Sequence, residues 1–215
     1  MQNSAQSVGS ASFLVEESDV RRALQKMKAG KAADRSGTVA ELFKTGGEFT
    51  VEQLTQAFNR ISKGGDIPEE WEVSEFVMLH KSGPRTSVDN YRPVALLPLS
   101  YKVFAAVVLE KLGASFQERM PIEQAGFAKD ASCLDNMASL QLLFERHVDY
   151  AMPGIVIAVD FRKAFDSVWH ESVRTALVAE GIPEEVVAVL MKVYSRHKGR
   201  VRGQREGKTF SINRG

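Results

Sequence analysis

The sequence is poor in cysteine and has no long hydrophobic run. Its single cysteine, Cys133, excludes an intramolecular disulfide framework and the cysteine and histidine patterns that bind structural zinc. No apolar stretch approaches the roughly 18 residues that a membrane-spanning helix needs. The N-terminal residues 1–12 lack the charged start and apolar centre of a signal peptide. We therefore expect a soluble, intracellular protein of the nucleus or the cytoplasm, with no membrane partner.

The sequence also lacks an excess of charge of either sign. Lys and Arg total 28 and Asp and Glu total 27, so bulk charge neither favours nor excludes a polyanionic partner. A hydrophobic content of 44% in 215 residues suffices for one large domain or two small subdomains. The charge is unevenly spread, because residues 196–215 contain one acid, Glu206, and seven bases: Arg196, Lys198, Arg200, Arg202, Arg205, Lys208 and Arg214. We expect a local cationic patch at this end.

Hydrophobic periodicity predicts a helix-rich α+β protein. Apolar residues at helical spacing predict helices that begin at Ser18, Thr38, Thr50, Ser100 and Ser132, each a favoured N-cap residue. Two more helices are expected at about 166–180 and after the break at 181–183.

Three segments predict strands. Residues 74–80 form one. Residues 91–97 have Pro93 near their start, so Pro93 suits an edge strand or a first-residue strand position and not a central strand. A loop at 81–90 connects them. Residues 200–213 alternate around a glycine-containing turn and predict a hairpin.

The most informative stretch is residues 154–170, GIVIAVDFRKAFDSVWH. Its unbroken apolar run, Ile155 to Val159, predicts a strand buried on both faces, and the run ends at Asp160. A carboxylate at the end of a buried strand is costly unless a cation or a donor meets it, so we expect a metal site there. The alternative is an Asp that ends a strand and caps a turn. Asp166 is predicted to cap the next helix.

Five motifs in order point to a family. They are KMKAGKAADRSGTVAELFK, IPEEWEVSEFVMLHKSG, YRPVALLPLSYKVF, EQAGFAKDASCLDNMASLQLL and VIAVDFRKAFDSVWH. In this order and spacing the chain resembles the reverse transcriptases of non-LTR (LINE-type) retrotransposons, over roughly residues 18–215. Each motif alone is short, but the five together make chance a poor explanation.

The resemblance implies right-hand polymerase fingers with an incomplete palm sheet. It divides the chain into a mobile N-terminal segment at 1–17, a fingers-like region at 18–152 and a partial palm at 153–215. The palm stops before the family's Tyr-x-Asp-Asp motif. Asp160 would be the catalytic residue and bind Mg²⁺ together with the carbonyl of Phe161, since two-metal nucleotidyl transfer needs hard oxygen ligands.

The resemblance also implies two further sets of contacts. The residues that match nucleotide contacts are Arg92, Lys81, Phe161, Gln124 and Phe165, the last of which would reject a 2′-hydroxyl. Those assigned to the template are Gly126, Phe127, Arg200 and Arg202. The competing interpretations are core packing for Phe165, solvated surface charges for Arg92 and Lys81, and a plain turn for residues 124–127.

Two departures from the family limit the expected activity. Ala128, Asp130 and Ala131 stand where the family has an arginine and a Gly-Arg-Ser/Thr. The sequence also contains no Asp-Asp pair. We expect a fragment of an RNA-directed DNA polymerase that is inactive alone, whose partners are an RNA template, a DNA primer, deoxynucleotide triphosphates and the missing palm and thumb in trans. The alternatives are a non-catalytic nucleic-acid-binding remnant and a gene fragment without function.

Overall fold

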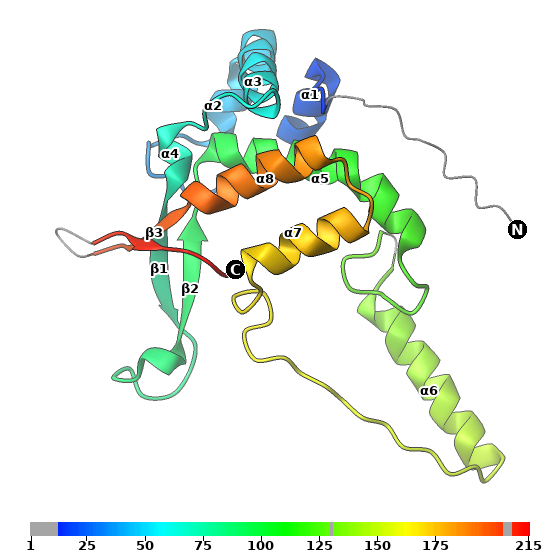
Figure 1. Ribbon diagram of the computed structural model, residues 1–215. Helices are drawn as coiled ribbons and strands as arrows, with labels where there is room; N and C mark the ends of the chain where they lie inside the picture. Colours follow the sequence, from blue (N-terminus) through cyan, green and yellow to red (C-terminus); the bar gives the residue numbers. More distant parts are fainter. Residues whose placement is uncertain (1–12, 130, 204–207) are drawn as a thin grey trace, which may run out of the picture. The chain divides into compact units, whose positions relative to one another are not determined.

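A computed structural model describes residues 13–129, 131–203 and 208–215 (Figure 1). The fold is mixed α+β and rich in helix, as predicted. The helices are α1 (Glu17–Lys26), α2 (Ala40–Thr45), α3 (Gly47–Ser62), α4 (Glu69–Glu72), the 3-10 turn η1 (Val88–Asn90), α5 (Leu99–Arg119), α6 (Cys133–Asp149), α7 (His170–Ala179) and α8 (Glu184–Arg196). The strands are β1 (Val73–His80), β2 (Tyr91–Leu96), β3 (Lys198–Val201) and β4 (Phe210–Ser211). The chain divides into two compact units, residues 111–164 and the remainder.

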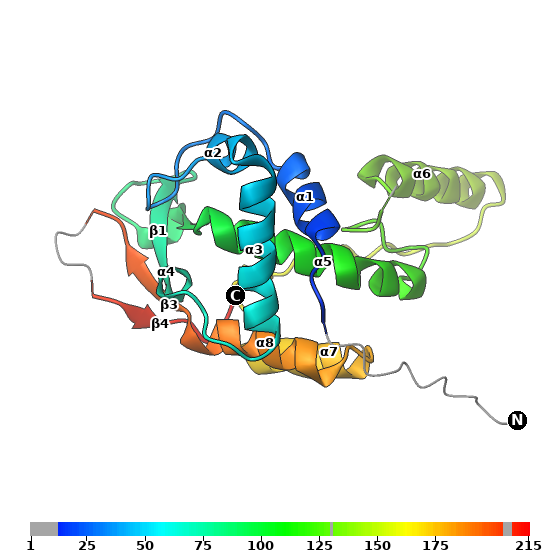
Figure 2. The ribbon, with the colours of Figure 1, turned by 90° about the horizontal axis from the view of Figure 1, so that it is seen from above.

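The larger unit has a core built by the apolar faces of α1, α3, α5 and α8. Helix α3 crosses α5 (Figure 2), where Phe58 and Phe104 meet with ring centroids 5.2 Å apart. The buried residues of these helices are Val20, Ala23, Leu24, Val51, Phe58, Ile61, Leu99, Val103, Phe104, Val107, Val108, Val186, Val187, Val189 and Val193. Most lie at the spacings that predicted the helices.

An aromatic cluster fixes the start of the sheet. Trp71 in α4 lies 5.2 Å from Phe104 and 6.3 Å from Phe58, measured between ring centroids. Its Nε1 donates a 2.8 Å hydrogen bond to Ser100 Oγ, so the indole buries its ring and still satisfies its polar atom. Because β1 begins two residues later at Val73, this cluster positions the strand.

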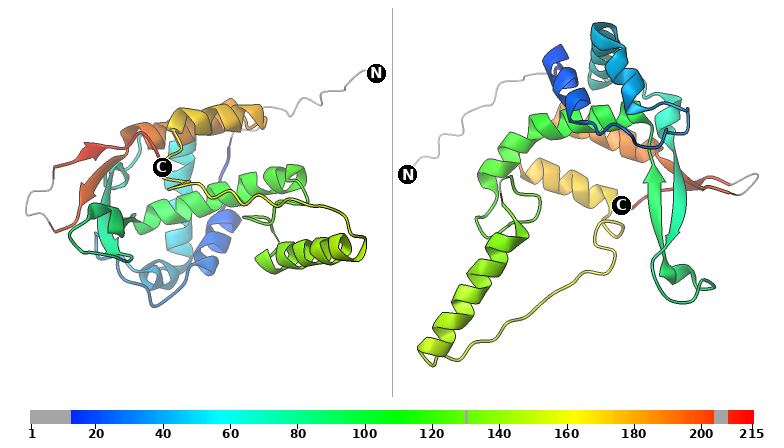
Figure 3. Two further views of the ribbon diagram at one scale, coloured as in Figure 1. Left: turned by 90° about the horizontal axis from the view of Figure 1, so that it is seen from below. Right: turned by 180° about the vertical axis from the view of Figure 1, so that it is seen from behind.

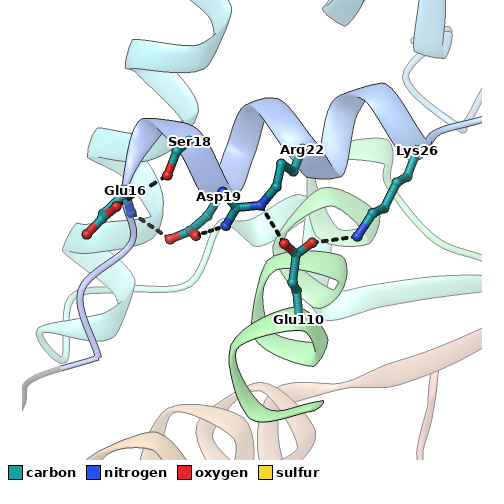
Figure 4. Close-up of polar contacts among 6 residues, drawn as sticks. All are labelled: Glu16, Ser18, Asp19, Arg22, Lys26 and Glu110. Atoms are coloured by element: carbon teal, nitrogen blue, oxygen red, sulfur yellow. Dashed lines mark hydrogen bonds and ion pairs between the residues drawn. The ribbon is translucent and has the colours of Figure 1, made fainter. Parts of the chain in front are cut away.

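A network of ion pairs ties α1 to α5 (Figure 4). Glu110 Oε2 accepts a 2.8 Å hydrogen bond from Lys26 Nζ, and Glu110 Oε1 accepts a 2.5 Å bond from Arg22 Nε. The hydrogen bonds from these two cations lower the pKa of the Glu110 carboxyl, and the bond from Lys26 has the larger effect. Arg22 also contacts the buried Asp19, whose carboxylate accepts the backbone N–H of Glu16 at the helix start.

The sheet has the strand order β2-β1-β3-β4 (Figure 3). β1 pairs with β2 antiparallel and with β3 parallel, and β3 pairs with β4 antiparallel. The edge position predicted for β2 is confirmed, as is the hairpin formed by β3 and β4. Residues 204–207 of that hairpin lie outside the described part of the chain.

Several predicted helix starts are wrong. α1 is capped by Glu16 and Asp19 in a reciprocal capping box, so Ser18 lies inside the helix. α3 begins at Gly47 and places Thr50 inside it, because Gly46 ends α2 and also starts α3. The N-cap positions of α2 and α7 are Val39 and Trp169 in place of Thr38 and Asp166, and α5 begins at Leu99, before Ser100. Residues that favour the N-cap position are also common in loops. The local sequence pattern therefore does not decide which of several neighbouring residues caps the helix.

The smaller unit contains the end of α5, α6 and the segment that follows it. The predicted capping box at the start of α6 is confirmed, since Asp135 Oδ2 accepts the Ser132 N–H at 2.8 Å. No residue of α6 is buried, and Cys133 at its start is exposed.

The predicted buried strand at 155–159 is also wrong in this structure. These residues have no strand hydrogen bonds, and Ile155 and Ile157 are 91% and 80% exposed. A strand needs a neighbouring edge that satisfies its backbone groups, and the described sheet is assembled from other segments. The apolar sequence alone therefore does not form the strand.

The structure describes only the last five residues, 13–17, of the segment that was predicted to be mobile. Residues 1–12 of the expected mobile segment lie outside the described residues. Val15, however, is buried, and it exchanges two 2.8 Å hydrogen bonds with the side-chain amide of Asn59 on α3. Across the described residues, no helix combines the length and the apolar content needed to cross a membrane.

Candidate nucleic-acid interface

One face of the sheet gathers arginines from distant parts of the chain. Glu75 of β1 is in register with Arg200 of β3, and Leu79 of β1 is in register with Arg92 of β2. Side chains alternate along a strand, so Glu75, Leu79 and their partners point to the same face. Arg202, two residues after Arg200, continues this face, where its backbone N–H donates to the carbonyl oxygen of Phe76 at 2.9 Å.

Glu75 is the centre of a cluster of guanidinium groups, which we call the Glu75 cluster: Glu75, Arg35, Arg200 and Arg202. Arg200 Nη2 donates a 2.7 Å hydrogen bond to Glu75 Oε1. Arg35 Nε lies 3.7 Å from Oε1 and Arg202 Nε lies 3.9 Å from Oε2, distances that indicate ion pairing without a hydrogen bond. The Glu75 side chain is 13% exposed, whereas those of Arg35 and Arg202 are 52% and 63% exposed.

The opposite face of β1 carries one buried polar residue, Ser74. Ser74 is fully buried and its Oγ lies 2.5 Å from Nε2 of His197, the residue before β3. Burial lowers the pKa of His197, and the nearby His170 lowers it further. This contact fastens the start of β3 to β1 and so supports the register that brings Arg200 to Glu75.

Lys81 and Arg92 lie at the other end of the β1–β2 hairpin. Lys81 follows His80, which pairs with Tyr91, and the Lys81 N–H donates to the Asn90 carbonyl oxygen at 2.8 Å. Both cationic side chains are exposed. The structure therefore brings together these two predicted phosphate contacts, although 10 positions separate 81 from 92 in the sequence.

In the smaller unit, Gln124, Gly126 and Phe127 form a turn. Gln124 Nε2 donates to the Gly126 carbonyl oxygen at 3.1 Å, and Gln117 Nε2 donates to the Phe127 carbonyl oxygen at 3.2 Å. Phe127 has φ of 62° and is 83% exposed. A bulky residue in the left-handed region costs free energy, and such strain concentrates at functional positions.

Asp160 and Phe161 lie in the exposed segment of the smaller unit. A carboxylate and a carbonyl are suitable oxygen donors for Mg²⁺, but they supply only part of its coordination shell. The described residues contain no group of three or more Asp, Glu, His or Cys side chains that could hold a metal ion. Phe165 belongs to the larger unit and is 69% exposed, so core packing does not account for it.

Comparison with known proteins identifies the family. The family described as reverse transcriptase (RNA-dependent DNA polymerase) matches residues 79–215, more than half of the chain. The chain belongs to the reverse transcriptase family. The predicted resemblance to non-LTR retrotransposon enzymes is confirmed, because the relatives include polymerases of such elements.

Among these relatives, the RNA-directed DNA polymerase from the mobile element jockey of Drosophila melanogaster is 30% identical over 123 residues. That match covers 54% of this chain and 13% of the jockey protein. The transposon TX1 uncharacterized 149 kDa protein of Xenopus laevis is 26% identical over 183 residues, 82% of this chain and 14% of the relative. This reverse transcriptase chain thus spans about one seventh of the curated relatives that it matches.

Sequence reasoning missed Arg35 and Glu75. Arg35 lies in the loop before α2, and Glu75 is an acid inside a strand between the buried Ser74 and the half-buried Phe76. Alternation along 74–80 places Glu75 opposite to Ser74, which is a signal that its side chain leaves the core. Its arginine partners depend on the parallel pairing of β1 with β3, which no local pattern in this reverse transcriptase predicts.

Proposed function

We propose that this chain is part of a non-LTR RNA-directed DNA polymerase and contributes to the template-directed addition of deoxynucleotides to a primer 3′-hydroxyl. The observation that carries this proposal is the family match over residues 79–215, which contains every predicted site residue. In this proposal residues 18–152 form the fingers and residues 153–215 begin the palm. The substrates are an RNA template, a DNA primer and deoxynucleotide triphosphates.

The exposed cations at the end of the β1–β2 hairpin support a phosphate-binding role. Arg92 presents a planar guanidinium that can donate two parallel hydrogen bonds to a phosphate, and Lys81 adds a point charge beside it. Because β1 and β2 are held by a register of six residue pairs, their hairpin offers these groups from a defined backbone. Phe127 and Gln124 would border the template and the nucleotide, and Phe165 would contact the sugar.

The same proposal makes the chain inactive alone. Magnesium chemistry in this family would use the Asp160 carboxylate, and the sequence holds no Asp-Asp pair to complete a site with it. The described residues place no further carboxylate beside Asp160 in a group that could hold a metal. A catalytic centre would therefore need acidic groups from outside these 215 residues.

Primer extension tests both parts of the proposal. The purified 215-residue chain is mixed with an annealed RNA template and DNA primer, deoxynucleotides and Mg²⁺. We expect salt-sensitive binding of the duplex and no extension. Extension by the chain alone would contradict its inactivity, and the absence of binding at low salt would contradict a role on nucleic acid.

The basic sheet face favours a second candidate, a non-catalytic nucleic-acid-binding protein. Supplying the downstream palm and thumb portion of a related polymerase distinguishes the two functions. A polymerase part regains extension, and Asp160→Asn then abolishes extension while leaving binding unchanged. A binding protein shows no extension under any of these conditions.

A further inference from the structure

Residues 154–160, which we call the 154–160 segment, have the sequence of a strand but lie exposed. Ile155, Ile157 and Val159 are 91%, 80% and 71% exposed. The segment adopts neither helix nor strand. Its residues 155–159 are all apolar and uncharged, and Ile and Val favour strands. An exposed segment with these properties is a site at which another chain pairs.

A partner of the 154–160 segment has to pair with its backbone as well as cover its side chains. If only the side chains were covered, the peptide N–H and C=O groups would leave water without new hydrogen bonds, which costs free energy. A helix uses its own backbone groups internally, so it cannot supply these bonds along its sides. The partner is therefore another extended segment.

The 154–160 segment is complementary to itself when two copies run antiparallel about Ile157. In that register Ile157 faces Ile157 of the second copy, and Ile155 faces Val159. Asp160 faces Gly154, so the two Asp160 carboxylates lie about 20 Å apart, at about 3.3 Å per residue over six residues. Parallel pairing would place the two carboxylates side by side, where they repel. Charge thus favours a two-fold arrangement in which one surface serves both copies.

Helix α6 supplies further apolar side chains next to this segment. The chain turns back at the end of α6, where the Met152 N–H donates to the His147 carbonyl oxygen at 2.9 Å (Figure 1). The helix and the segment belong to the same compact unit. One stripe of α6 at helical spacing, which we call the α6 stripe, is apolar and between 41% and 79% exposed: Leu134, Met137, Leu140, Phe144 and Val148.

The apolar area is sufficient for a dimer. Ile155, Ile157 and Val159 point to one face of a strand, because side chains alternate along it. With the α6 stripe they make eight apolar side chains in each copy, between 41% and 91% exposed. Each such side chain removes roughly 100 Å² from water when fully buried, so their exposed parts supply about 500 Å² per copy and about 1,000 Å² in total. A specific interface needs about 1,000 Å².

We propose that two copies of this chain associate through the 154–160 segment, which forms an antiparallel pair of strands centred on Ile157 and covered by the two α6 stripes. The partner is a second copy of this chain. The inference does not depend on the proposed function, because it uses only the pairing properties of residues in the smaller unit.

Sedimentation velocity of the nucleic-acid-free 215-residue chain between 5 and 500 µM measures the association. We expect the mass to rise from 23.8 kDa to twice that value, with a Kd of about 10–100 µM for an interface at the small end of the known range. A mass of 23.8 kDa at every concentration would overturn the inference. Growth beyond a dimer would overturn the two-fold arrangement.

A charge exchange at residue 157 tests the two-fold axis. Ile157→Lys and Ile157→Asp each place two like charges opposite one another, so each should raise the Kd about tenfold or more. An equimolar mixture of the two variants should recover the dimer, which a misfolded variant cannot do. Ile122→Lys is the matched control, because Ile122 lies in the same unit and is 96% exposed, and it should leave the Kd unchanged. Equal association by Ile157→Lys and Ile122→Lys, or a mixture that stays monomeric, contradicts the proposed pairing.

Single cysteines test the direction of the strands in a Cys133→Ser background, which removes the one native thiol. Directly opposed strand residues have Cα atoms about 4.5–5.5 Å apart, within the range of a disulfide. On mild oxidation, Ile157→Cys should cross-link two copies. Ile155→Cys should cross-link only when it is mixed with Val159→Cys. Cross-linking of Ile155→Cys to itself as fast as that of Ile157→Cys would show parallel pairing and overturn the antiparallel register.

Two variants of α6 test its part in the interface. Phe144→Lys adds a charge to the α6 stripe and should raise the Kd about tenfold. Leu142→Lys is the matched control, because Leu142 is 60% exposed and lies on the other side of the same helix. A dimer that is lost in Phe144→Lys but persists in Ile157→Lys would place the second copy on α6 alone and overturn the strand pairing.

Discussion

Replacing Phe58 by alanine should severely destabilise the larger unit, because Phe58 is 1% exposed and packs against two other rings. Burial of such a side chain contributes about 1.5–3 kcal/mol. Its contacts with Phe104 at 5.2 Å and Trp71 at 6.3 Å each add about 0.5–1.5 kcal/mol, measured between ring centroids. We therefore expect a loss of about 3–5 kcal/mol, the range found for large aromatic truncations in cores.

Urea denaturation followed by Trp71 fluorescence measures this loss. The chain has two tryptophans, and a Trp169→Phe background leaves Trp71 as the only indole. With a slope of about 2 kcal/mol per molar urea, the midpoint should fall by about 2 M. The slope itself should stay constant if the folded state keeps its compactness.

Phe49→Ala is the matched control, since Phe49 lies on the same helix and is 70% exposed. We expect its effect to stay within about 0.5 kcal/mol. Equal losses at Phe58 and Phe49, or a loss below about 1 kcal/mol at Phe58, would refute the assignment of the aromatic cluster as the core that positions β1.

Three further predictions concern other parts of the chain. Glu110→Gln breaks the ion pairs between α5 and α1 and should lower the melting temperature slightly, by an amount equivalent to about 1 kcal/mol or less, with the effect shrinking in 1 M salt. Burial holds the pKa of His197 below its usual value, so on acidification the unfolded chain takes up a proton that the folded chain does not. Stability should therefore fall as the pH drops from 7 through about 6.5 to 5.5. In thermal melts, His197→Gln should flatten that dependence on pH. Phe127→Asn suits the left-handed backbone and should leave stability unchanged or raised, while RNA affinity falls if the exposed ring stacks on a base; equal affinity would remove Phe127 from the interface.

Hydrophobic periodicity predicted which segments form helices better than it predicted the residues at which those helices begin. The apolar spacing along α3 and α5 identified Phe58 and Phe104 as core residues, because helical spacing is a local property of the sequence. The start of α6 at Ser132 was predicted correctly, and the structure closes a reciprocal capping box between Ser132 and Asp135. Near α1, Glu16 and Ser18 both offer an acceptor oxygen, and only the packed structure decides between them.

The segment at 155–159 shows where local reasoning fails. Its sequence has the composition of a buried strand, yet Val156 and Val159 are 55% and 71% exposed. Burial of a strand on both faces depends on two neighbouring strands and two covering layers, and none of these is a property of the five residues themselves. The prediction of Asp160 as a metal ligand depends on the same neighbouring strands and layers. If residues 155–159 do not form a buried strand, Asp160 is not held at the end of one.

The distribution of charge on the sheet also depends on residues that are distant in the sequence. The chain has a net formal charge of +1, a value that favours no polyanion. Parallel pairing of β1 with β3 places Arg200 beside Glu75, 125 residues away in sequence, and the loop before α2 adds Arg35 to the same face. With Arg92 and Arg202 included, four arginines and one glutamate lie on this face. Under the proposed function, affinity for nucleic acid would depend on the potential at the surface that the ligand meets. The sheet register, and the Ser74–His197 contact that supports it, would then control binding more directly than composition does.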